Sequence, residues 1–171
     1  MNAVGALGYP PEIAALAEIL YPGRAGPRPR MPEVLPHIQL DQWPAPEFLH
    51  ELLEWSVSLP DVTVQQSRMA SPDSTALALA DECAAGPPEA FIDLAEFCHL
   101  HAAPPGGVHL TLPSSIGETA VRLGWAESHP AAKSGSVTPC LIAVYAPRDR
   151  RELEAAMALI AASWRFARGR P

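Results

Sequence analysis

Hydrophobic residues recur at two spacings along the chain, and the longer spacing predicts helices. Residues 46–59 carry apolar side chains every three or four positions, as an amphipathic helix requires. The same spacing predicts a long C-terminal helix, for which Asp149 and Glu152 match a capping box. Its apolar face would contain Leu153, Met157, Ile160 and Trp164. These stripes are expected to pack on a common core.

Two shorter helices are expected elsewhere in the chain. Residues 11–20 have one apolar side and a proline in the first turn. Ser115 and Glu118 also have capping-box spacing, and Gly124 is placed to end that helix in the left-handed conformation. This second helix would deliver the polar residues that follow it close to the sheet.

The shorter spacing, alternating or continuously apolar, predicts strands. Residues 62–68 and 75–80 favour a first hairpin, residues 90–101 and 108–112 a second, and residues 139–145 a last strand. We expect loops between them, at residues 81–89 and 131–138. The order of helix, two hairpins, helix, strand and helix predicts an α+β fold. Its sheet should be mainly antiparallel and covered on one face by helices, with a long C-terminal helix.

The chain of 171 residues divides by composition into an arm and a body. Residues 1–40 combine the short helix with a run rich in proline, glycine and arginine, which is typical of an extended segment lying on a domain. Residues 41–171 contain all the other predicted elements. We therefore expect a proline-rich N-terminal arm followed by a single α+β domain.

The second hairpin carries three of the six histidines. Side chains alternate along a strand, so Phe97, His99 and His101 should share one face, and Cys98 and Leu100 the other. If His101 pairs with His109, the apolar side chains of both strands point to the core, namely Cys98, Leu100, Val108, Leu110 and Leu112. The second face then carries His99, His101, His109 and Thr111. Glu127 and His129, at the exit of the following helix, should lie nearby.

This grouping allows three interpretations. Three imidazoles on a rigid sheet could hold a divalent transition-metal ion, zinc-like or iron-like, with an open coordination position, and His129 or Glu96 could also approach it. The same groups could instead form a metal-free acid/base or ligand-binding cluster. A half-solvated antiparallel face also accepts histidine and threonine without any ligand. The candidate catalytic residues are His99, His101, His109, Glu127 and His129, and the candidate metal ligands are His99, His101 and His109.

Composition and charge exclude several function classes. The net charge of −7 opposes binding to nucleic acids or anionic membranes, whose phosphates need a basic surface. There is no apolar run long enough to span a bilayer, no secretory signal pattern, and an odd number of cysteines, so a cytoplasmic protein is expected. Glycine-rich phosphate loops and the G-x-S-x-G serine motif are also missing.

Four runs of residues together resemble the small bacterial and fungal luciferase-domain proteins. They are Glu96 to His101, Gly107 to Leu112, Gly124 to Pro130 and Val144 to Asp149, and a softer match covers Pro36 to Gln42. The main resemblance spans residues 59–166. It implies a fold but no particular reaction. The order of elements also resembles the YjbR/MmcQ-type fold, which implies a sheet with helices on one side.

Two functional hypotheses follow. In the first, a histidine-lined site on the sheet face binds a small molecule or a metal ion, and the protein is either an enzyme or a ligand-binding protein. In the second, the protein is a non-catalytic interaction module that uses the proline-rich arm or the open sheet face to hold a protein partner or a second copy of itself.

Overall fold

Six antiparallel strands form one sheet in the order β1-β2-β3-β4-β6-β5 in the computed structural model, which describes residues 11–102, 104 and 106–170. The strands are β1 (Val62–Gln66), β2 (Thr75–Leu79), β3 (Glu96–Leu100), β4 (Val108–Thr111), β5 (Ala126–Ser128) and β6 (Leu141–Val144). The helices are α1 (Pro11–Leu20), α2 (Pro46–Val57), α3 (Ser114–Arg122), α4 (Pro130–Lys133) and α5 (Arg150–Ala167), with single 3₁₀ turns η1 (Asp81–Cys83) and η2 (Pro88–Ala90). The predicted α+β class and the long C-terminal helix are confirmed.

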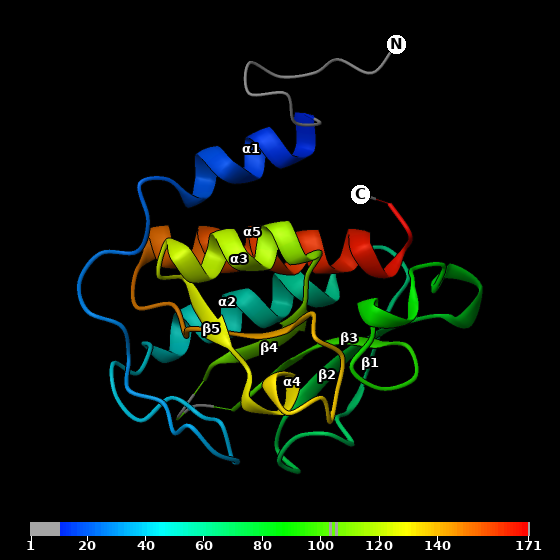
Figure 1. The fold of residues 1–171 in the computed structure, drawn as a ribbon, viewed down its shortest axis with the longest axis horizontal. Helices are drawn as coiled ribbons and strands as arrows, with labels where there is room; N and C mark the ends of the chain where they lie inside the picture. The colour runs from blue at the N-terminus through cyan, green and yellow to red at the C-terminus, as the bar shows by residue number, and fades with distance from the viewer. Residues whose placement is uncertain (1–10, 103, 105, 171) are drawn as a thin grey trace.

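The hydrophobic core lies between one face of the sheet and the longer helices. Helix α5 contacts β3 and β4, and α1, α2 and α3 pack beside it or against neighbouring strands, whereas α4 lies on the other side of the sheet (Figure 1). The core-facing side chains of the second hairpin are Cys98, Leu100, Val108, Leu110 and Leu112, all at most 5% exposed. No described helix has both the length and the apolar character needed to cross a membrane.

The second hairpin pairs in a register two residues away from the predicted one. His109 lies opposite His99 rather than His101, and the His101 amide bonds to the Gly107 carbonyl beyond the strand end. A shift of two residues preserves the alternation of faces, so the three histidines still share one side of the sheet. The structure therefore differs from the prediction in the register of the two strands and not in the face that each side chain occupies.

A β-bulge in β3 changes the predicted face of one residue. Leu77 pairs with Cys98 but Ala78 pairs with Glu96, so Phe97 is an extra residue opposite no partner on β2. Phe97 therefore joins the hydrophobic core instead of the histidine face. Glu96 moves the other way, onto the face that carries His99. Alternation alone could not reveal this, because a bulge breaks it.

Several other local predictions need correction. Helix α3 begins at Ser114 with Pro113 as its N-cap residue and no side-chain cap, so the predicted Ser115 capping box does not form. Gly124 does adopt φ +79°, as a left-handed helix end requires. Strand β5 was not predicted, and the loop expected at 131–138 begins within helix α4. Both elements are too short to leave a periodic signal.

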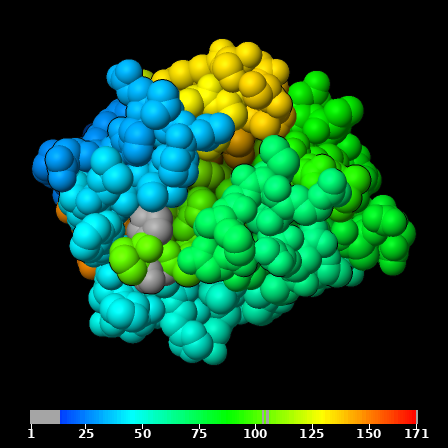
Figure 2. Space-filling view, turned by 90° about the horizontal axis from the view of Figure 1, so that it is seen from below, coloured from blue at the N-terminus to red at the C-terminus, as the bar shows by residue number. Residues whose placement is uncertain are grey.

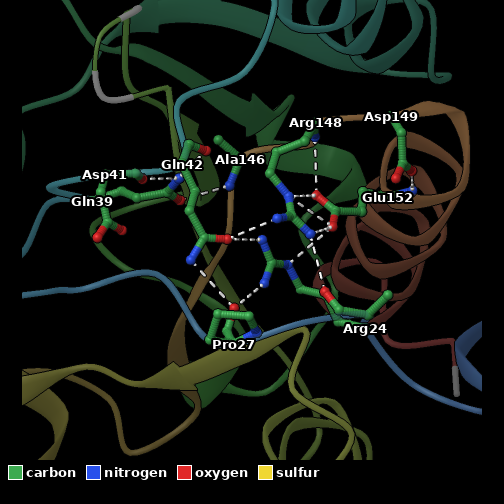
Figure 3. A network of polar contacts seen from close by, with 10 residues as sticks. Arg24, Pro27, Gln39, Asp41, Gln42, Ala146, Arg148, Asp149 and Glu152 are labelled. Carbon is green, nitrogen blue, oxygen red and sulfur yellow. Dashed lines mark hydrogen bonds and ion pairs between the residues drawn. The ribbon is translucent and has the colours of Figure 1, made fainter.

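The arm is bound along the body by hydrogen bonds that span most of the chain. The Trp125 indole donates to the Leu20 carbonyl (2.8 Å), and the Ala146 amide donates to Gln39 Oε1 (3.0 Å). Arg24 donates to Gln42 and lies beside Glu152 at the start of α5, in a polar network that also contains Arg148 (Figure 3). The arm therefore has a defined path, although the division of the chain at residue 40 remains a prediction.

Candidate metal centre

A single cross-strand row brings the first two histidines together. His99 on β3 lies opposite His109 on β4, His109 opposite Ala143 on β6, and Ala143 opposite Glu127 on β5. Directly paired residues share a face. The residue between His109 and Glu127 in this row is the small Ala143.

The imidazoles of His99, His101 and His109 point at one another. His109 Nδ1 lies 3.1 Å from His99 Nε2 and 3.4 Å from His101 Nε2. One ligand atom from each of the three residues lies within 4.8 Å of the others. All three residues are buried: His99 is 2% exposed, His101 8% and His109 6%. These three histidines form a cluster that could hold a metal ion.

Hydrogen bonds fix the orientation of two of these rings. His99 Nδ1 lies 2.7 Å from Glu96 Oε1, and Ser67 donates to the same carboxylate at 2.9 Å. In the tautomer in which Nδ1 donates to this carboxylate, Nε2 presents a lone pair to the cluster. His101 Nδ1 contacts the Ser74 hydroxyl at 3.1 Å. A carboxylate–histidine pair of this kind is the usual support of a metal-binding imidazole.

Two more histidines extend the cluster. The His129 ring lies edge-on to His109 with centroids 4.7 Å apart, and its Nδ1 accepts from the Ala131 amide. His37, which comes from the arm, lies 5.0 Å from the His129 ring. Its Nδ1 is 2.7 Å from the Pro32 carbonyl and its Nε2 3.1 Å from Glu127 Oε1. Glu127 therefore contacts the cluster through the His37 ring. Its second oxygen, Oε2, accepts a hydrogen bond from the Tyr145 hydroxyl.

His37 is the site residue that our sequence reasoning missed. It lies within the softer family match from Pro36 to Gln42, in the segment assigned to the proline-rich arm. The residue is 3% exposed, which is unusual for histidine in an extended segment. A polar ring within this family-like run was the only signal that could have identified it.

Burial disfavours the charged form of the clustered histidines. It lowers the pKa of His101 to about 4, with a further contribution from His99, and lowers the pKa of His129 to about 4. The pKa of His109 falls well below its usual range for the same reason and because four other histidines surround it. These rings are neutral at pH 7. Neutral imidazole is the form that binds metal ions.

A cavity of about 440 Å³ opens onto the cluster. Figure 2 shows the hollow between the arm (blue), the segment around α4 (yellow) and the β1–β2 loop (green). His99, His101, His109, His129 and His37 all line it. The histidine face is therefore enclosed by the arm and by α4, and the expectation of a half-solvated face is wrong. The reason is that distant segments fold over it.

Comparisons with known proteins agree with the sequence resemblance. Residues 95–163 match the family model of the luciferase domain, and this segment contains every predicted site residue but not His37. No curated protein and no solved structure matches the chain. The weaker resemblance to the YjbR/MmcQ-type fold stays a prediction. The chain is thus similar to the luciferase domain over residues 95–163.

Proposed function

We propose that this protein binds one divalent transition-metal ion through His99 Nε2, His101 Nε2 and His109 Nδ1, and uses that ion to hold and activate a small molecule. The observation that carries the proposal is the convergence of three buried imidazole nitrogens on one point. Without a cation, the His109 Nδ1 contacts can be satisfied only by sharing an N–H proton, whereas an ion would engage a lone pair from each of the three rings.

The spacing of these nitrogens suits a metal. Two nitrogen ligands at roughly 2.0–2.1 Å from one ion are about 3.3 Å apart in tetrahedral geometry and about 2.9 Å apart in octahedral geometry. The two contacts of His109 measure 3.1 and 3.4 Å. The third pair of nitrogens, of His99 and His101, lies within 4.8 Å, so a bound ion would draw these two rings together.

The ligand set leaves room for chemistry. Three neutral protein ligands are typical of catalytic sites, in which a water molecule or a substrate occupies the remaining position. The cavity borders all three ligands, so that position would face it. A bound ion would polarise an oxygen of the small molecule or lower the pKa of a bound water molecule. His129, neutral beside His109, would border the same space.

Metal titration tests the proposal. Chelator-stripped protein should take up one Zn²⁺ or Co²⁺ per chain in calorimetry, and the Co²⁺ form should show the visible bands of a low-symmetry nitrogen site. Replacing His101 by alanine should weaken binding by more than about 100-fold, since losing even a group that only orients a ligand costs about 10- to 100-fold. His50→Ala is the matched control, because His50 is exposed on α2 and lies outside the cluster. Folded wild-type protein that binds no ion, or equal binding by both variants, would refute the proposal.

The interaction-module hypothesis rests on the arm, which is only partly engaged within its own chain. Contacts of Leu20, Arg24 and Gln39 hold it to the body. The side chains of Tyr21, Val34 and Leu35 stay 62–71% exposed. A protein partner or a homodimer, and the cytoplasmic location, remain predictions.

A further inference from the structure

The walls of the cavity differ from its floor. The five histidines gather on one side, and the other lining residues are apolar except for Ser71. The apolar walls come from the arm, the β1–β2 loop, the segment before β3 and the segment from α4 to β6. They include Ile38, Met69, Ile92 and Val137.

None of the residues that line this cavity in the described part of the chain is Lys, Arg, Asp or Glu. Arg68, in the β1–β2 loop, faces Asp93 at 3.5 Å, and Arg148 is paired with Glu152. The Ala131 amide at the start of α4 already donates to His129. A phosphate group would therefore find neither a cationic side chain nor this backbone donor, which are the groups that normally bind it.

From this polarity, and resting on the metal centre proposed above, we infer that the bound molecule is small and largely apolar, with one oxygen-bearing head group and no second charge. The head would bind the ion, whose double charge is not neutralised by three neutral imidazoles. The tail would lie against the apolar walls. A volume of about 440 Å³ is within the usual range for small-molecule pockets. Nucleotides and phosphorylated sugars would be excluded by charge.

A series of straight-chain monocarboxylates, from acetate to octanoate, tests this inference on Co²⁺-loaded protein. Affinity is read from the change in the visible Co²⁺ bands. Each added CH₂ should tighten binding about fourfold until the cavity is filled, which corresponds to about 0.8 kcal/mol per buried CH₂. Suberate, which has the length of octanoate but a second carboxylate, and inorganic phosphate should bind no better than acetate.

Two matched variants locate the effect. Ile38→Trp adds bulk to the arm side of the cavity and should end the gain at shorter acids. Val64→Trp is the control, because Val64 is 56% exposed on β1 and does not line the cavity. Both variants should keep one bound ion.

Metal content and carboxylate affinity are measured on the same samples, so the two ideas can fail separately. Protein that takes up no Co²⁺ would overturn the metal centre and, with it, this inference. Loaded protein whose affinity is flat across the series, or that prefers suberate or phosphate, would overturn only the apolar ligand class. A chain-length gain unaffected by Ile38→Trp would also overturn it, since the tail would then bind elsewhere.

Discussion

Glu152 offers the sharpest test of how the arm is held to the body. Its carboxylate is 6% exposed in the first turn of α5, between Arg24 of the arm and Arg148, which lies four residues before it. It accepts from the Arg148 amide at 2.9 Å and from Arg148 Nε at 3.0 Å, and it lies 3.2 Å from Arg24 Nε. The Arg24 side chain is 2% exposed, and burial lowers its pKa while Glu152 raises it.

Glu152→Gln keeps the shape of the side chain and removes its charge. The Arg24 guanidinium then loses its carboxylate, and one acceptor oxygen becomes an NH₂ group facing other donors. Removing one partner of a buried pair costs about 3–5 kcal/mol. We expect the lower end, about 3 kcal/mol, because the Arg148 side chain is 30% exposed and stays partly hydrated. For a protein of this size, that loss lowers the melting temperature by roughly 6–12 °C.

Urea unfolding and calorimetry of metal-free protein measure the effect. The control is Glu51→Gln, which removes the acidic partner of Arg150 in a pair whose side chains are 45% and 58% exposed. Such surface pairs contribute little, so this variant should unfold almost like the wild type. Equal losses of unfolding free energy in the two variants would show that burial of an ion pair does not govern its contribution to stability. The reasoning that the Arg24–Glu152 contact holds the arm to the body would then be wrong.

Two further predictions concern the histidine cluster. Glu96→Gln should weaken Zn²⁺ binding about 10- to 100-fold, because the carboxylate that orients His99 is lost; unchanged affinity in calorimetry would count against Glu96 as the support. Metal-free protein should lose stability as the pH falls from about 6.5 towards 4. In that range the unfolded chain protonates His101 and His129, whereas burial keeps their folded pKa values at about 4. Between these pH values, each histidine makes the free energy of unfolding fall by about 1.4 kcal/mol per pH unit. Denaturant titrations at several pH values should show a weaker dependence of this free energy on pH for His129→Gln but not for His50→Gln.

Local patterns were sufficient for the long elements and for most of the histidine face. Helices α2 and α5 were predictable because amphipathic periodicity extends over several turns, and Asp149 does cap α5 by accepting from the Glu152 amide. The second half of that capping box is replaced: the Glu152 carboxylate binds the Arg148 amide instead of its own cap residue. Competition from Arg24 and Arg148, which periodicity cannot register, determines where the carboxylate lies.

The sequence by itself determined which side chains share a face of the sheet. Alternation along the two strands places His99, His101 and His109 on one side, and a register shift of two residues does not change this. Only the tertiary structure decided the rest of the site. A bulge at Phe97 turned Glu96 towards His99, and the arm brought His37 over the sheet to meet Glu127. Alternation is a property of neighbouring residues in the chain. Bulges, register and the burial of a face depend on which distant segments pack together, and that is settled by the free energy of the whole fold.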